Sequence, residues 1–220
     1  ANVFDWAVLA VEKVKEVFER GKLPILVGGT GMYLRAITDG ISIVPKIDPQ
    51  IKLEVKKLQQ ELRESFYELV TEKDPKIMGV LHRNDSQRLS RALEVFLQTG
   101  KSVTELNTEN KKLIDRKFLY VRVLPDTKVV LENIVTRIRA MISKGAIEEV
   151  EALKLKGLDL SAPVCKAIGV KEIWSFLEGD CSYEGMLEAL TISTRRYAKR
   201  QRTWFKNQVK ESILVSELLF

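Results

Sequence analysis

The stretch that decides the predicted fold is Leu23-Pro24-Ile25-Leu26-Val27-Gly28-Gly29-Thr30-Gly31. A continuous apolar run that ends in a glycine-rich turn is typical of a buried parallel strand that leads into a helix. Apolar residues recur at the spacing of one helical face over residues 4–20, and a further short helix is expected over residues 32–38. The stretch therefore predicts a helix–strand–turn–helix unit of an α/β sheet.

The glycine turn itself is the first candidate site. Backbone N–H groups of Gly28 and Gly29 at the start of a helix can bind an anion, and the hydroxyl of Thr30 adds a donor. The alternative is a tight strand-to-helix turn in which Thr30 serves as the helix N-cap. The residues alone leave both interpretations open.

Composition narrows the class of protein. The chain has 220 residues, of which 45% are hydrophobic, with 36 Lys and Arg against 30 Asp and Glu and a formal net charge of +6. Two cysteines and one histidine disfavour a disulfide scaffold and most histidine-based metal sites. No apolar run approaches the ~20 residues needed to span a bilayer, and the first residues do not resemble a signal peptide, so we expect a cytoplasmic protein. The basic balance modestly favours a polyanionic partner.

The sequence as a whole predicts three regions. Residues 1–44 are expected to form part of the α/β core, residues 45–116 a helical insertion, and residues 117–220 a return to the core followed by helices. A strand is expected over residues 117–123, where apolar residues dominate. Apolar periodicity and capping residues predict the other helices, over 48–70, 75–81, 86–99, 127–143, 146–156, 168–178 and 183–207.

One apparent phosphate-binding motif is rejected. Gly100-Lys101-Ser102 looks like the end of a P-loop, but Val95 stands where the motif requires its first glycine, and a helix precedes it rather than a strand. Gly100 is better interpreted as a helix C-cap.

A polar helix start is the second candidate site. In the block from Asn84 to Arg91, Asp85 is a good N-cap, and Gln87 and Arg91 lie opposite the apolar face. A glutamine amide can hold an adenine edge by two hydrogen bonds, and an arginine can reach phosphate. The pattern alone favours the alternative, an ordinary solvated helix face.

The third candidate is the block from Thr194 to Lys206, which has basic but no acidic residues. At helical spacing, Arg195, Lys199, Arg202 and Lys206 form one narrow stripe, with aromatic residues largely on the other side. Because acidic residues usually alternate with basic ones on a solvated helix, the pattern favours nucleic-acid contact over a plain basic surface.

Four blocks in this order resemble the tRNA dimethylallyltransferase family, also called tRNA isopentenyltransferases. They are the segment from Gly21 to Tyr33, the Asn84–Lys101 block, Lys166-Ala-Ile-Gly-Val-Lys-Glu172 and Thr194–Phe205. Val170 departs from the family pattern, which usually has Tyr there.

The resemblance implies an α/β fold with a P-loop NTPase-like parallel sheet as its core and a mainly helical insertion. It also implies that the core is of the kind that binds nucleotides such as ATP. It implies transfer of a dimethylallyl group from dimethylallyl diphosphate to N6 of the adenosine on the 3′ side of the anticodon in tRNA. We expect Mg²⁺ as cofactor, tRNA and dimethylallyl diphosphate as partners, no membrane and a monomer. The alternatives are a non-catalytic tRNA-binding module and a P-loop kinase of small molecules.

The resemblance also implies roles for individual residues. Thr30 and Arg137 would be catalytic, and both would bind diphosphate together with Gly28 and Gly29. Arg137 is expected at the edge of an apolar stripe of Ile134, Ile138 and Met141 that packs on the sheet, with Asn133 standing where the family has a second arginine. No protein metal ligands are implied. The residues implied to bind tRNA are Lys52, Gln87, Arg88, Leu89, Ser90, Arg91, Lys166, Ala167, Ile168, Gly169, Val170, Lys171, Thr194, Arg195, Arg196, Lys199, Arg200, Gln201 and Arg202.

The family's phosphate-gripping loop and its aspartate base both precede the first of these blocks. We therefore expect the chain to represent an N-terminally truncated member that is inactive by itself.

Overall fold

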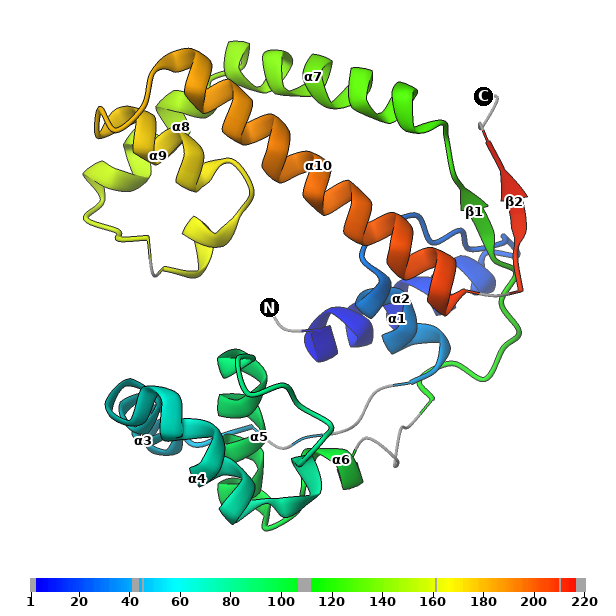
Figure 1. Cartoon of the computed structure of the whole chain (residues 1–220). Coiled ribbons are helices and arrows are strands. Elements are labelled where there is room, and N and C mark those ends of the chain that lie inside the picture. The colour runs from blue at the N-terminus through cyan, green and yellow to red at the C-terminus, as the bar shows by residue number, and fades with distance from the viewer. Residues whose placement is uncertain are drawn as a thin grey trace. The chain divides into compact units, whose positions relative to one another are not determined.

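A computed structural model describes residues 3–40, 44, 46–106, 112–160, 162–209 and 211–216. The chain divides into two compact units, Ala1–Lys117 and Phe118–Phe220, which are described separately (Figure 1). Among the described residues most are helical, and the strands form one small parallel sheet. This agrees with an α/β fold at the coarse level, whereas the P-loop-like core and the three predicted regions stay predictions.

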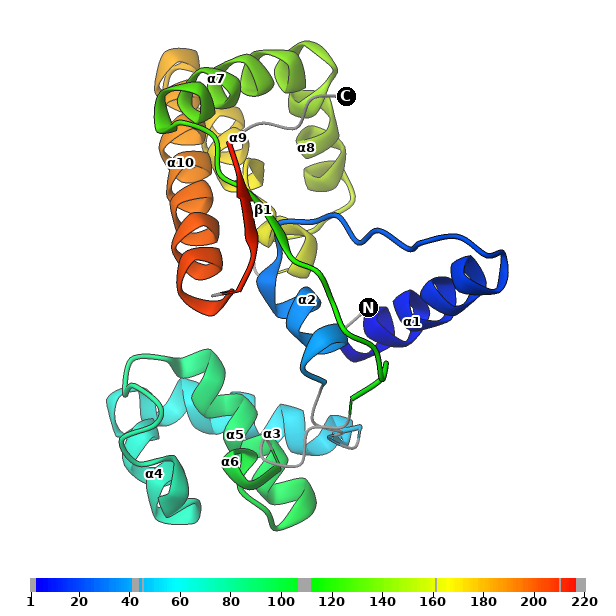
Figure 2. The ribbon, with the colours of Figure 1, turned by 90° about the vertical axis from the view of Figure 1, so that its right-hand side faces the viewer.

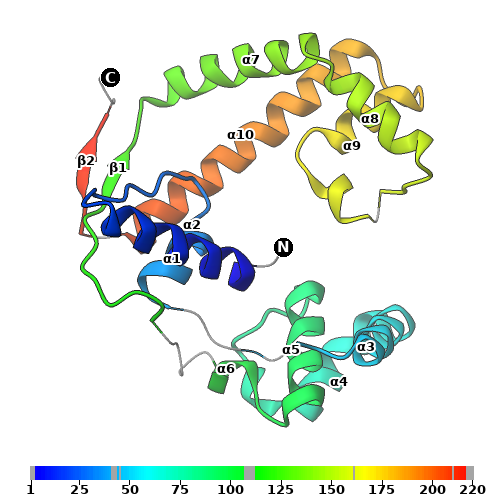
Figure 3. The same cartoon turned by 180° about the vertical axis from the view of Figure 1, so that it is seen from behind.

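In the first unit, α1 (Val3–Glu19) packs on α2 (Gly31–Thr38), as the view from behind shows (Figure 3). The buried face of α1 presents Ala7, Val11 and Val14, as its apolar period predicts. The rings of Trp6 and Tyr33 stack between the two helices, with centroids 4.6 Å apart.

The predicted buried strand over residues 23–27 is wrong. The structure has no regular secondary structure there, and Leu23, Ile25 and Val27 are 78%, 79% and 92% exposed. A strand exists only through hydrogen bonds to a neighbouring strand, and no described segment pairs with this one. The apolar sequence alone is not enough to form it.

The helical part of this unit has more breaks than its sequence period suggests. The predicted helix over 48–70 is divided into α3 (Pro49–Leu62) and α4 (Phe66–Lys73) by a 3₁₀ turn, where Arg63 has a positive φ of 42°. The helix expected over 75–81 is reduced to a 3₁₀ turn, Pro75–Ile77. The remaining elements are α5 (Ser86–Thr99), whose bounds match the prediction, and the short α6 (Val103–Leu106), which was not predicted.

The hydrophobic core of these helices lies among α3, α4 and α5. Its buried residues include Val55, Phe66, Leu89 and Leu93. Gly100 ends α5 in the left-handed conformation and its N–H donates to Phe96 O, so the interpretation of Gly100 as a C-cap is confirmed.

The second unit gathers four helices and a 3₁₀ turn, Pro163–Lys166, around its own core (Figure 2). The helices are α7 (Thr127–Ser143), α8 (Ala146–Leu155), α9 (Val170–Leu177) and α10 (Tyr183–Gln208). Ile134 and Ile138 of α7 pack in this core with residues of α9 and α10. The expectation that their stripe packs on the sheet is therefore wrong, because neighbouring helices bury it instead.

Helix α10 extends from the α8–α9 end of this unit to the sheet (Figure 1). There β1 (Val121–Val123) pairs in parallel with β2 (Ile213–Val215), Val121 opposite Ile213. The strand expected over 117–123 is thus shorter than predicted, and β2 was not predicted. No helix of the described residues is long and apolar enough to cross a membrane.

Candidate nucleic-acid interface

Helix α10 is anchored by its first half and exposes cations from its second. It begins at Ser182, whose Oγ accepts the N–H of Gly185, and Met186 and Leu190 are fully buried. Beyond Thr194, which is half-buried, the basic residues are exposed, whereas the aromatic residues and Gln201 are half-buried. The predicted difference between exposed cations and more buried aromatics is confirmed, but the two sets are not fully separated, because Trp204 lines a hollow with Arg196, Lys199 and Arg200 and the Arg200 guanidinium lies 5.6 Å from the centroid of the Tyr197 ring. The exposed cations are Arg195, Arg196, Lys199, Arg200, Arg202 and Lys206; the half-buried side chains are Tyr197, Gln201, Trp204 and Phe205.

The basic residues of α10 lack a carboxylate partner among the residues that the structure describes. None of the ion pairs within the described part of the chain involves a basic residue of this helix. Arg196, Lys199 and Arg200 line an open hollow together with Thr203, Trp204, Asn207 and Gln208. We call the three cations of this hollow the α10 cationic face. Its charge is therefore available to a polyanion.

Arg202 does not behave like the rest of the predicted stripe. Its Nη1 lies 3.2 Å from Pro125 O and 3.3 Å from Thr127 Oγ1, so it links α10 to the start of α7. The four-residue stripe expected from the helical period is thus divided between exposed cations and a cation with internal hydrogen-bond partners.

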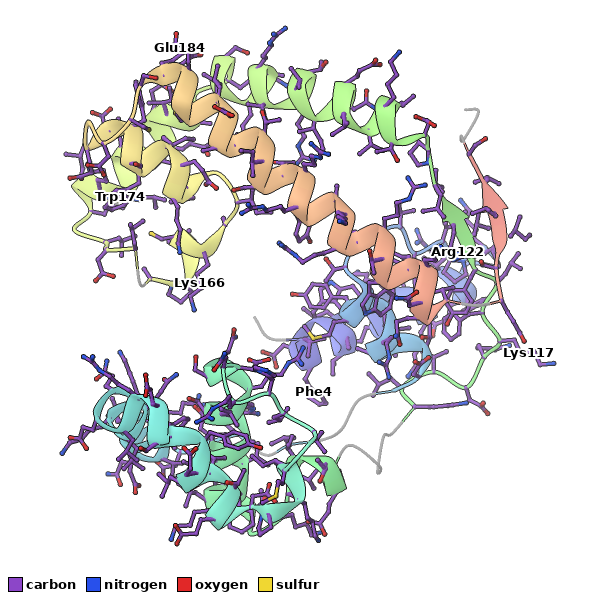
Figure 4. All side chains as sticks on the ribbon, viewed as in Figure 1. Phe4, Lys117, Arg122, Lys166, Trp174 and Glu184 are labelled. Atoms are coloured by element: carbon purple, nitrogen blue, oxygen red, sulfur yellow. The ribbon has the colours of Figure 1, made fainter. Side chains whose placement is uncertain are left out.

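The end of α10 is also held by a residue that sequence reasoning missed. Arg122, labelled on β1 in Figure 4, donates from Nη1 to Phe205 O at 3.2 Å and from Nε to Ser212 Oγ at 2.6 Å. A cation at a helix C-terminus also interacts favourably with the helix dipole. The sequence did contain a signal for this role, because Arg122 is a cation between two apolar residues of a strand.

The block Lys166–Lys171 joins the 3₁₀ turn Pro163–Lys166 to the first turn of α9, and its glycine packs against α10. Gly169 has φ 105°, and a Cβ there would lie 3.3 Å from Leu190 Cδ2, so only glycine fits without strain. Around this buried glycine, Lys166, Ala167, Ile168 and Lys171 are exposed and Val170 is half-buried. The structure therefore brings this predicted block and α10 together in one unit.

The block on α5 offers a different surface. Gln87, Arg88 and Arg91 are exposed, but Arg88 Nε lies 3.4 Å from Asp85 Oδ2 and Arg91 Nη1 lies 3.2 Å from Glu94 Oε2.

Two other residues of the α5 block point inward. Leu89 is 1% exposed and belongs to the core, so its side chain has no surface to offer RNA. Ser90 is half-buried, and its Oγ is buried without a hydrogen-bond partner among the described residues.

The predicted diphosphate residues lie in both units. Thr30 is the N-cap of α2, but its side chain makes no capping hydrogen bond and is exposed. A Cβ at Gly28 would meet nothing within 4 Å, and its φ is not positive, so nothing in the described chain requires a glycine there. Arg137, in the second unit, is exposed on α7. Lys52 is exposed on α3.

Within the described residues, no three His, Cys, Asp or Glu side chains form a group that could hold a metal ion. Mg²⁺ is usually held by one or two carboxylates together with substrate phosphates and water, so the expected Mg²⁺ stays a prediction.

Comparison with known proteins gives a consistent family. A family model described as IPP transferase matches residues 1–208. A tRNA dimethylallyltransferase of Rickettsia felis is 38% identical over 213 residues, which cover 96% of this chain and 69% of that protein. The enzyme of that name from Rickettsia conorii is 37% identical over 215 residues, covering 96% of this chain and 59% of the relative. The chain thus spans roughly 59–69% of the length of these two relatives.

Solved structures agree. The full-length tRNA isopentenylpyrophosphate transferase of Bacillus halodurans matches with a TM-score of 0.62 and 28% identity over 97% of this chain and 66% of that one. A eukaryotic dimethylallyltransferase, described as acting on tRNA, matches with a TM-score of 0.79 and 25% identity over 98% of this chain and 56% of that one.

Proposed function

The chain belongs to the IPP transferase family, and on that premise we propose that it takes part in transferring a dimethylallyl group from dimethylallyl diphosphate to N6 of the adenosine 3′ to the anticodon in tRNA. It acts on tRNA as a monomer in the cytoplasm. The α10 cationic face carries the proposal, because Arg196, Lys199 and Arg200 are exposed and have no carboxylate partners in the described chain.

The chemistry is a substitution at the allylic carbon. The N6 lone pair forms a C–N bond with the first carbon of the dimethylallyl group, the C–O bond breaks, and diphosphate leaves with its electron pair. The N6 proton passes to a base or to solvent. The adenosine must leave the base stack for N6 to reach this carbon, which is the problem that base-flipping enzymes solve.

Residues of this chain have distinct roles in the proposal. Gly28, Gly29 and the unengaged hydroxyl of Thr30 approach the diphosphate, which accounts for a glycine at position 28 that the chain itself does not require. Arg137 stabilises the charge that develops on the leaving diphosphate. Gln87 reads the adenine, and the cations of α10 and of the Lys166–Lys171 block contact the RNA backbone.

Transfer and binding are tested together, using the protein expressed from its complete gene. Labelled dimethylallyl diphosphate is incubated with an anticodon stem-loop that carries adenosine at the target position, and with a matched stem-loop that carries guanosine there. The proposal expects label in the adenosine stem-loop alone. Tight binding of both RNAs with no transfer would instead support the tRNA-binding module, and ATP-dependent phosphorylation of a nucleoside without RNA binding would support the kinase.

A further inference from the structure

We propose that Glu172 is a positioning residue, which fixes the Lys166–Gly169 loop on α10 so that the cations of the loop and of the α10 cationic face form one RNA-contacting surface. This inference rests on the proposed function, since it concerns the same RNA site. Its test is arranged to separate the two.

One carboxylate joins the loop to two helices. Glu172 Oε2 accepts the N–H of Gly169 at 3.1 Å, and Glu172 Oε1 accepts a short hydrogen bond from Ser193 Oγ. Glu172 lies in the first turn of α9, Gly169 is the N-cap of α9, and Ser193 belongs to α10. The two oxygens therefore bind groups from two different parts of the chain.

The end of the loop at Gly169 lies close to two helices. A Cβ at Gly169 would lie 3.3 Å from Leu190 Cδ2 on α10 and 3.7 Å from Met141 Cε on α7. The backbone of the loop is thus in close contact with the buried side of both helices. A small rotation of α9 would move the loop as a whole, and Glu172 opposes this rotation through Ser193.

Ser193 immediately precedes the α10 cationic face along the helix. Arg196, Tyr197 and Arg200 follow it at i+3, i+4 and i+7, so they share its side of α10. Arg196 and Arg200 are exposed and line the hollow described above. The hydrogen bond from Ser193 to Glu172 therefore ties α9, and with it the loop, to α10 at a position three residues before Arg196.

The loop brings cations of its own to this place. Lys166 of the loop is exposed, as is Lys171 in the adjoining first turn of α9, and Figure 4 shows Lys166 on the turn before α9 with its side chain directed away from that helix. A phosphate backbone that follows α10 would meet these lysines only while the loop keeps its position. Ordinary helix capping does not require such a link, because a cap needs only the oxygen that accepts the Gly169 N–H. Capping explains the hydrogen bond from Gly169 to Glu172, but it does not explain the second hydrogen bond, which Ser193 of α10 donates to the same carboxylate.

The test is a double-mutant cycle between Lys166→Ala and Glu172→Leu, read as the salt dependence of binding to an anticodon stem-loop. Lys166→Ala should flatten the log–log slope by about 0.7–0.9 in the native background. In the Glu172→Leu background, the same change should flatten it by less than half as much. Glu172→Gln should keep the native slope, because its carbonyl can accept from Gly169 and its amide can donate to Ser193.

Two controls separate position from charge and folding. Glu178→Leu removes the same charge at the other end of α9, where Glu178 pairs with Lys154, and should leave the effect of Lys166→Ala intact. Ser193→Ala keeps the cap on Gly169 but removes the link to α10, so it should weaken the effect of Lys166→Ala as Glu172→Leu does, even where Glu172→Leu fails to fold.

The outcomes are distinct. An equal effect of Lys166→Ala in native, Glu172→Leu and Ser193→Ala proteins overturns the positioning role. The positioning role is also overturned if Lys166→Ala alone keeps the native slope while Arg196→Ala alone flattens it. In that case the loop does not contact the RNA. If neither lysine nor arginine substitution changes RNA binding, the proposed function fails and the inference falls with it.

Discussion

Helices α5 and α10 both carry blocks that resemble RNA-binding elements, but their cations have different surroundings. On α5, Arg88 and Arg91 lie within 4 Å of carboxylates three residues away. On α10, no basic residue forms an ion pair with a carboxylate of the described chain, and Arg196, Lys199 and Arg200 line an open hollow. An exposed ion pair is worth only about 0–1 kcal/mol, so RNA could displace the α5 pairs, but it gains less there than from unpaired cations.

The difference suggests a division of labour between the two helices. We expect α10 to supply most of the charge-dependent affinity, because Arg196, Lys199 and Arg200 form no ion pair within the described residues. We expect α5 to contribute through Gln87, a neutral side chain that can read a base, more than through its arginines.

The largest expected effect tests whether Leu89 belongs to the core of α5 or to its RNA surface. Leu89→Ala should lower the free energy of unfolding by about 2–5 kcal/mol, because it opens a cavity among α3, α4 and α5. Denaturant unfolding measures this loss. Leu97→Ala on the same helix is the control, since Leu97 is 39% exposed and should lose much less. Equal losses for the two variants would contradict the placement of Leu89.

Gln87 sharpens the comparison by testing base reading on α5. Loss of a bidentate contact to adenine should cost roughly 1–3 kcal/mol, and the discrimination between adenosine and inosine stem-loops should shrink by a similar amount. Binding titrations of Gln87→Ala and native protein with both RNAs measure it. Discrimination that survives in the variant would remove Gln87 from the site.

Matched pairs of arginines test the division of labour itself. Arg196→Gln with Arg200→Gln on α10 should flatten the salt dependence by about 1.4–1.8 in log–log slope, for two lost phosphate contacts. Arg88→Gln with Arg91→Gln on α5 removes the same charge and should flatten it less. The division of labour is wrong if titrations over a range of salt concentrations give the two double variants the same slope.

Local signals predicted helix bounds well. The bounds of α5 and α7 match the expectation, because Asp85 and Asp126 cap their first turns and Gly100 ends α5. These interactions involve residues close in sequence, so the sequence can reveal them. The apolar and basic faces of α10 were also predicted, because the helical period alone fixes which residues share a face.

Interactions between distant residues were not predictable in this way. The run over residues 23–27 has the composition of a strand but no partner among the described residues, while β2 pairs with β1 from about ninety positions away. Strand pairing depends on which segments meet, and neither partner's sequence specifies the other.

The candidate site shows the same difference between local features, which the sequence reveals, and contacts between distant residues, which it does not. The sequence by itself determined which residue types gather in the Gly28–Thr30 turn, the α5 block, the loop at Lys166 and the second half of α10. Only the tertiary structure decided that Arg202 is bound to Pro125 O, that Leu89 is buried, and that Glu172 joins Gly169 to Ser193. The physical reason is that helical periodicity is a property of neighbouring residues, whereas a side chain's partner is set by the packing of elements that are far apart in the chain.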